Sequence, residues 1–257
     1  GVPEGLPPLA LDAPPRGASY LLHEHWGGTW YDVEKSPLSS EDDNLCWAAA
    51  AANVLAWTGW GDVVPPLAGA DAMFGYLQDH WTDQPGEPRY AWDWWFDGTN
   101  DRQGYAGWAQ LDVPGGGFYP AESFQDHYAE NVSWSLALPK ISEALQAGRG
   151  VALVVYGPGG HAVTCWGYTY NPENPSQYYG VWLTDSDDDA SNPTPPDRLR
   201  YYDVALSGNR WYLQGFYGSN SWYIDTVGSL ARRPERPEIV VGRHVLLPDT
   251  PGQTIPI

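Results

Sequence analysis

Cysteine is scarce in this sequence. The 257 residues include two cysteines, Cys46 and Cys165, which excludes the disulfide framework that stabilises many small secreted domains. A chain of this length buries a large enough core to fold without disulfides. Methionine, with 1 residue, and phenylalanine, with 5, are also rare, whereas 15 tryptophans and 17 tyrosines are present. Amphipathic rings of this kind suit recognition surfaces as well as cores.

Basic residues are also few. Lys and Arg total 13 against 32 Asp and Glu, which gives a formal net charge of −19. An acidic chain of this kind disfavours nucleic acid and anionic membrane surfaces as partners. No apolar run reaches the roughly 18 residues that a membrane-spanning helix needs, so the sequence predicts no membrane span.

The composition along the chain predicts one main domain between two proline-rich ends. Residues 1–19 are rich in Pro, Gly and Ala, and we expect them to form an extended strap. Residues 20–230 are predicted to fold as one domain, and residues 231–257 are expected to form a proline-rich tail. The chain begins Gly1-Val2 without a signal peptide, so we expect a mature form or an excised piece.

The rest of the chain is organised around residues 42–57. Asp42, Asp43 and Asn44 are of the residue types that cap helix N-termini, and an almost wholly apolar, alanine-rich run follows them. A helix that is apolar all round belongs in a protein interior, so we predict a buried helix with Cys46 in its first turn. The positive field at a helix N-terminus favours the thiolate form of such a cysteine. The alternative is a small buried thiol in the core.

Periodicity predicts the remaining elements. Helices are expected at 70–80 and 138–147, and strands at 30–35, 151–156, 161–168, 179–184, 199–204, 210–216 and 222–226. Residues 92–96 form a dense aromatic cluster, which is either satellite core, the interpretation that we favour, or a platform on which a ligand stacks. A helix followed by a series of mostly antiparallel strands is an α+β pattern.

His161 and the acidic run that begins at Asp185 are predicted to meet. If the strands at 161–170 and 179–185 form a hairpin centred near residue 174, His161 lies opposite about residue 188. A shift of a few residues brings Asp185 or Asp187 level with the imidazole, and the two carboxylates share a face if the chain is extended. Cys46, His161 and Asp185 then supply a nucleophile, a base and a group that orients the base.

The same acidic run was tested as a calcium loop. Counted from Asp185, loop positions 1, 3 and 5 are Asp, but Ala190 stands where an EF-hand needs Gly. Pro196 stands where the bidentate Glu is needed. An EF-hand is therefore excluded, while a looser calcium site remains an alternative.

Local motifs around this triad resemble those of papain-like proteases. Asn44-Leu45-Cys46-Trp47-Ala48 is similar to their nucleophile helix, and Gly160-His161-Ala162-Val163 with Gly167-Tyr168 is similar to their histidine strand. Two papain features are absent: Ser40 replaces the Gln that serves the oxyanion, and an Asp replaces the Asn that orients the His. Asn220, in Asn220-Ser221-Trp222, is an alternative orienting residue that we rank below Asp185.

Both departures resemble the IdeS/Mac family of streptococcal immunoglobulin-degrading cysteine endopeptidases. The matching blocks, in the family's order, are Trp30-Tyr31-Asp32 through Lys35, Asp42-Asp43 through Leu45-Cys46, His161-Ala162-Val163 with Trp166-Gly167, and Thr184-Asp185-Ser186-Asp187 with Asp189-Ala190-Ser191. In that family, a lysine about ten residues before the cysteine serves the oxyanion. Lys35 lies eleven residues before Cys46, so the resemblance implies a one-residue insertion in the loop between them. Residues 58–150 do not match, and we expect substrate-binding surface there.

The resemblance implies a papain-like α+β fold, in which a buried nucleophile helix packs on a mostly antiparallel sheet. It implies that Cys46 attacks a peptide carbonyl, that His161 transfers the proton and that Asp185 orients His161. Asp187 would assist and pair with Lys35. Lys35 and the Cys46 backbone N–H would stabilise the oxyanion. The implied protein is a secreted bacterial virulence factor, monomeric and without cofactor or metal, that acts on a protein substrate such as immunoglobulin.

Two other functions remain open at this point. A papain-like amidase, acyltransferase or isopeptidase would use the same triad on a different acyl donor. A non-catalytic, aromatic-rich binding module would leave Cys46 and His161 unexplained. Cys165 shares a strand face with His161 and is predicted to be a core thiol behind the site, because a disulfide with Cys46 would silence the nucleophile.

Overall fold

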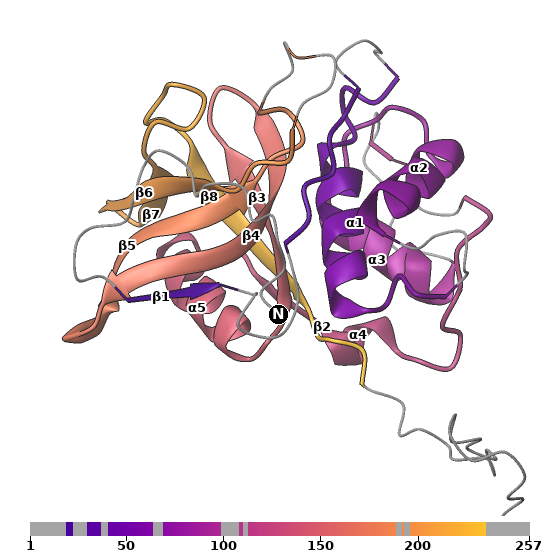
Figure 1. The fold of residues 1–257 in the computed structure, drawn as a ribbon, viewed down its shortest axis with the longest axis horizontal. Coiled ribbons are helices and arrows are strands. Elements are labelled where there is room, and N and C mark those ends of the chain that lie inside the picture. Colours follow the sequence, from indigo (N-terminus) through magenta and orange to yellow (C-terminus); the bar gives the residue numbers. More distant parts are fainter. Residues whose placement is uncertain are drawn as a thin grey trace, which may run out of the picture.

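The computed structural model describes residues 19–22, 30–36, 41–63, 69–98, 108–109, 113–188, 192 and 196–234. The strands gather on one side of the molecule, and the helices α1, α2 and α3 gather on the other, with α1 beside the strands (Figure 1). The strap predicted at the N-terminus and most of the predicted tail lie outside the described residues, so those boundaries stay predictions. Among the described residues, no helix has both the length and the hydropathy that crossing a membrane requires.

Six antiparallel strands form a closed barrel. They are β3 (Gly150–Tyr156), β4 (Gly160–Asn171), β5 (Asn174–Thr184), β6 (Arg200–Ser207), β7 (Arg210–Leu213) and β8 (Tyr223–Leu230). Hydrogen bonding runs in the order β4-β3-β8-β7-β6-β5, and β5 pairs with β4 to close the ring. Two short strands lie outside it: β1 (Ser19–Leu22) pairs with β4, and β2 (Tyr128–Asn131) pairs with β8.

The expected papain-like fold, with a helix packed on an open sheet, is therefore wrong. The β4–β5 hairpin is long, and its register shifts between Cys165 and Gly167 and again between 169 and 171. Such irregularities bend and twist strands. The bend lets β5 continue the ring through β6 while β4 continues it through β3, and closure removes the free edges that an open sheet would leave. Strand propensity reveals individual strands but not this curvature.

The barrel interior and the helical side have separate cores. Inward-facing residues of β3 and β4, such as Leu153 and Val163, pack with Leu138 and Ile141 from helix α5 (Ala137–Gln146), which contributes to the barrel interior. Ala152 and Ala162 point the other way and pack with α1 (Cys46–Thr58). The alternation of strand side chains thus serves two cores at once.

Helix α1 packs closely against the strands because small residues line the contact. Its alanines at 48–52 are buried, and Gly150 of β3 faces it: a Cβ at this glycine would lie 2.7 Å from Val54 Cγ1 and 2.9 Å from Thr58 Cγ2. Asn53 fixes the register of α1, since its Nδ2 donates to Thr164 Oγ1 at 3.1 Å and its Oδ1 accepts the Val33 N–H at 3.2 Å. One buried amide therefore joins α1, β4 and the segment that carries Lys35.

The helical side is a tryptophan-rich core. It contains α2 (Ala70–His80), α3 (Pro88–Asp97) and, nearer the barrel, α4 (Phe124–His127). The short 3₁₀ turn η3 (Trp134–Leu136) lies against the barrel, where Trp134 contacts Tyr223 of β8. Trp92, Trp94 and Trp95 of α3 are fully buried, which confirms that the 92–96 cluster is core. Each indole N–H reaches a backbone carbonyl, respectively of Ala51, Val113 and Trp60, so these rings also satisfy buried loop backbone.

Candidate active site

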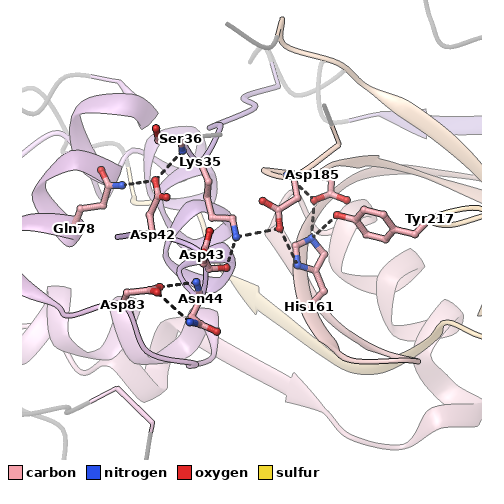
Figure 2. Close-up of polar contacts among 11 residues, drawn as sticks. Lys35, Ser36, Asp42, Asp43, Asn44, Gln78, Asp83, His161, Asp185 and Tyr217 are labelled. Atoms are coloured by element: carbon pink, nitrogen blue, oxygen red, sulfur yellow. Dashed lines mark hydrogen bonds and ion pairs between the residues drawn. The ribbon is translucent and has the colours of Figure 1, made fainter. Parts of the chain in front are cut away.

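Cys46 is the first residue of α1, as expected, but the residues before it do not cap the helix. The N-cap is Leu45, and no side chain makes a capping hydrogen bond. Asp42 instead accepts the Ser36 N–H at 2.8 Å and the Gln78 amide at 2.9 Å (Figure 2). The cap prediction is wrong because these polar groups find partners on neighbouring segments. The first N–H groups of the helix, that of Cys46 included, have no intrahelical acceptor.

A second set of hydrogen bonds, to Asp83 in the segment after α2, also holds the turn before Cys46. Asn44 donates its backbone N–H to Asp83 Oδ1 at 2.5 Å and its side-chain amide to Asp83 Oδ2 at 3.0 Å (Figure 2). Together with the Asp42 contacts, this bond fixes the backbone on both sides of the turn that delivers the thiol. Position 46 is therefore preorganised by polar contacts rather than by a cap.

His161 is the second residue of β4 and lies opposite Val155 of β3. Its Nε2 lies 2.6 Å from Asp185 Oδ1, and both side chains are buried. The hairpin register predicted from the sequence is confirmed: Thr164 pairs with Thr184, so continuing that register places position 187 opposite His161. The turn after β5 therefore brings the acidic run to the imidazole (Figure 2).

Asp185 and Asp187 reach different sides of the ring. The extended conformation expected for 185–187 is wrong, since these residues form a turn in which the Asp187 N–H donates to Asp185 Oδ1 at 3.1 Å. Asp187 Oδ2 consequently lies 3.8 Å from His161 Nδ1, while Asp185 holds Nε2. The two carboxylates flank the imidazole from opposite ends of the ring.

Cys46 lies close enough to His161 to contribute, by hydrogen bonding and charge, to the raised pKa of the imidazole. Asp185 occupies Nε2, so Nδ1 is the ring nitrogen available to the sulfur. Burial alone would lower the pKa of His161, but the charge and hydrogen bond of Asp185, helped by Cys46, raise that pKa well above its usual value. These contacts therefore favour the charged form of the imidazole, which lies between two carboxylates.

Lys35 points into the same site from residues 30–36, which form an irregular segment rather than the expected strand. Its backbone N–H donates to the Ser186 carbonyl at 3.1 Å. Its Nζ donates to the Asp43 carbonyl at 2.5 Å and pairs with Asp187 Oδ2 at 3.0 Å (Figure 2). The predicted Lys35–Asp187 pair is confirmed, and the ammonium group lies at the turn that precedes Cys46.

Tyr217 belongs to the site, although no sequence pattern selects it. Its hydroxyl lies 3.5 Å from His161 Nε2, close to the Asp185 carboxylate, whose charge and hydrogen bonding help to raise the pKa of the phenol. The connection between β7 and β8 carries this residue, and the motif noted in that loop, Asn220-Ser221-Trp222, pointed to Asn220 and not to Tyr217. Only the barrel, which curls β7 and β8 back toward β4, reveals the contact.

Two other sequence predictions are settled by position. Asn220 does not orient His161, because its Oδ1 accepts the Gly215 N–H at 2.7 Å on the exposed side of its loop. Cys165 is a fully buried free thiol whose pKa burial raises to about 12. Cys46 is also free and only partly buried, so no disulfide joins the two.

A metal ligand set was sought among the described residues. His161, Asp185 and Asp187 place one donor atom each within 4.8 Å of one another. In this arrangement Asp185 is bonded to His161 Nε2, and Asp187 is paired with the Lys35 ammonium group. The cation that balances Asp187 is thus a side chain of the protein, and these residues are better matched to proton transfer than to an ion.

Comparison of the sequence with protein-family models and with curated protein sequences finds no match. The geometry of the site and the local motifs around it are therefore the features that indicate a function. A surface cavity of about 600 Å³, bordered by Trp57 and Asp62, lies at the opposite end of α1 from Cys46.

Proposed function

We propose that the protein is a cysteine endopeptidase that hydrolyses peptide bonds of a protein substrate with a Cys46–His161–Asp185 triad. One observation carries the proposal: His161 Nε2 lies 2.6 Å from the buried Asp185 carboxylate, and Cys46 is near enough to help raise the pKa of the same imidazole. A nucleophile, a base and an orienting group in contact are what thiol-based acyl transfer requires. This constellation recurs on unrelated folds, so a barrel is compatible with it.

In the proposed reaction, the Cys46 thiolate attacks the peptide carbonyl and forms a tetrahedral oxyanion. The protonated His161 then donates its proton to the leaving amine, and a thioester remains on Cys46. Neutral His161 next removes a proton from water, whose oxygen attacks the thioester; the carboxylic acid leaves, and the Cys46 thiolate and protonated His161 are restored. Asp185 holds the ring in one orientation through both steps and stabilises its charged form.

Two donors are proposed for the oxyanion. The Cys46 N–H is at the start of α1, where it has no intrahelical acceptor. The Lys35 ammonium group bonds to the Asp43 carbonyl in the preceding turn and carries a positive charge toward the same space. Charge placed in advance where an oxyanion develops is among the largest catalytic contributions. Asp187 keeps the Lys35 chain in place.

The local motifs support a protein substrate. The blocks around Lys35, Cys46, His161 and Asp185 resemble those of immunoglobulin-degrading endopeptidases, which makes immunoglobulin the first substrate to test and an extracellular location the one we propose. The aromatic-rich residues between α1 and α5 do not share that resemblance.

The test is incubation of the purified protein with immunoglobulins and a broad panel of other proteins, with cleavage sites determined by mass spectrometry. The proposal predicts defined internal cleavages that Cys46→Ala abolishes, with the circular dichroism spectrum unchanged. Cys165→Ala is the matched control and should retain cleavage. The contrary result is that every protein of the panel stays intact while the protein hydrolyses small amides or transfers their acyl groups. That result would indicate an amidase or acyltransferase and would contradict the endopeptidase proposal.

A further inference from the structure

Tyr217 has an unusual backbone conformation. Its φ is +50°, and it is the one residue other than glycine with positive φ in the described part of the chain. Gly215 and Gly218, which lie close to it in the same loop, have φ of 75° and 68°, so Tyr217 adopts a conformation that two nearby positions leave to glycine. A side chain at such a position is strained. Strain of this kind persists only where surrounding contacts hold it, and it often marks functional positions.

The contacts that hold Tyr217 lead to the active site. Its ring packs edge-on against Phe216 at 4.7 Å and contacts Trp222 at 5.8 Å between centroids. Its other side meets the His161 ring at 5.8 Å and 75°. The hydroxyl reaches Asp185 and lies 3.5 Å from His161 Nε2 (Figure 2). The strained backbone thus delivers a phenol to the bond that orients the base.

Tyr217 also covers that bond. Its side chain is 49% exposed, whereas His161 and Asp185, directly beneath it, are 8% and 3% exposed. Water that reached the His161–Asp185 pair would compete for the same hydrogen bond, and shielding strengthens the electrostatic interaction between the two groups.

We propose that Tyr217 is a positioning residue, whose phenol O–H donates to the Asp185 carboxylate and holds it in line with His161 while the ring excludes water. The inference rests on the proposed function and names a fourth member of the site. A neutral donor suits this position. The phenol O–H stabilises the Asp185 carboxylate without neutralising its negative charge, which therefore still stabilises the charged form of His161.

The charges around Asp185 fit this role. His161 faces it from β4 and Tyr217 from the β7–β8 connection, while the carboxylates of Asp187 and Asp188 repel it. Burial would raise the pKa of Asp185, but His161 and the hydrogen bonds, that of Tyr217 included, hold the pKa below its usual value. Removal of the phenol O–H should therefore raise the pKa of Asp185.

The test is the rate at which iodoacetamide alkylates Cys46, measured from pH 4 to 9 in the unmodified protein and in Tyr217→Phe. Phe keeps the ring and removes the O–H. We expect the maximal rate to fall about tenfold as Asp185 and His161 lose alignment, and the acid limb of the profile to move to higher pH. The melting temperature should stay within about 2 °C. Tyr212→Phe, half-buried on β7, is the matched control and should leave rate and profile unchanged.

An unchanged pH profile in Tyr217→Phe would overturn the inference. So would a rate that falls only in proportion to a lower melting temperature, because that result would indicate packing alone. The two proposals fail differently: slow alkylation of Cys46 in the unmodified protein overturns the cysteine endopeptidase as well, whereas fast alkylation that Tyr217→Phe does not alter overturns only the role of Tyr217.

Discussion

His161 Nε2 and Asp185 Oδ1 lie 2.6 Å apart, and neither side chain has appreciable access to solvent. They come from β4 and from the turn after β5, two strands that pair directly with each other. The closing seam of the barrel therefore holds the base and its orienting group, while α1 supplies the nucleophile from outside. The site lies where the two cores of the molecule meet.

The first prediction concerns Asp185→Asn. The amide keeps the size of the side chain but removes the charge that raises the pKa of His161, and it no longer fixes the imidazole tautomer. We expect kcat on the substrate found by the protein panel to fall at least about 10²-fold. Asp203→Asn, an exposed carboxylate on β6, is the control and should behave as the unmodified protein. Activity within about threefold of normal in Asp185→Asn would contradict the triad.

Lys35→Met tests the oxyanion role. Met approximates the length of the lysine side chain but removes its positive charge, so kcat should fall about 10²-fold while KM changes little. Lys140→Met is the control, because Lys140 forms an exposed pair with Glu143 one turn away on α5. If Lys35 served only to neutralise Asp187, the double variant Lys35→Met/Asp187→Asn would recover normal kcat, and that recovery would refute the proposed role.

The third prediction concerns stability and pH. Burial, followed by the charges of Asp188 and Asp185, raises the pKa of Glu34 to about 8. A carboxyl with a raised folded-state pKa favours folding below its unfolded pKa of about 4.3. That contribution is lost as the pH rises through about 8. His161, also with a raised pKa, acts in the same direction from about 6.5 upward.

The melting temperature should therefore decline between pH 5 and 9, and Glu34→Gln should reduce the decline. Glu143→Gln, an exposed glutamate on α5, is the matched control and should leave the slope as it is. Differential scanning calorimetry at intervals across this range measures the effect. Equal slopes in the unmodified protein and Glu34→Gln would show that Glu34 does not take up a proton on folding.

A fourth prediction tests the packing that positions α1. Gly150→Ala places a Cβ 2.7 Å from Val54 Cγ1, so α1 must shift or strain, and unfolding in urea should show a loss of about 1–3 kcal/mol. Gly75→Ala in α2 meets nothing within 4 Å and should stabilise the protein by up to about 1 kcal/mol through helix propensity. Equal stability of the two variants would argue against close packing at Gly150.

The sequence predicted those parts of the site that depend on local pattern. The apolar run after Cys46 predicted a buried helix with the cysteine in its first turn, because helix character and burial follow from residue type. The hairpin register that brings Asp185 to His161 followed from loop length and the two-residue period of strands. Lys35 and its pairing with Asp187 came from the family resemblance rather than from any local rule.

What the sequence could not predict depends on curvature and on distant contacts. Closure of the barrel arises from register shifts in β4–β5, which residue types do not announce. Tyr217 approaches His161 only because that closure brings the β7–β8 loop to β4. Asp42 and Asn44 were predicted to cap α1, but Ser36, Gln78 and Asp83 offered competing partners from elsewhere in the chain.

The most direct test of the account is the alkylation of the two cysteines by iodoacetamide near pH 6, followed by mass spectrometry of the peptides. The protein contains a partly buried Cys46 beside an imidazole whose pKa is raised, and a fully buried Cys165; the thiolate is the form that reacts. We predict that Cys46 is labelled at least about 10²-fold faster than Cys165, and that His161→Gln removes most of this difference. Equal, slow labelling of both cysteines, or fast labelling of Cys46 that His161→Gln leaves unchanged, would contradict the account.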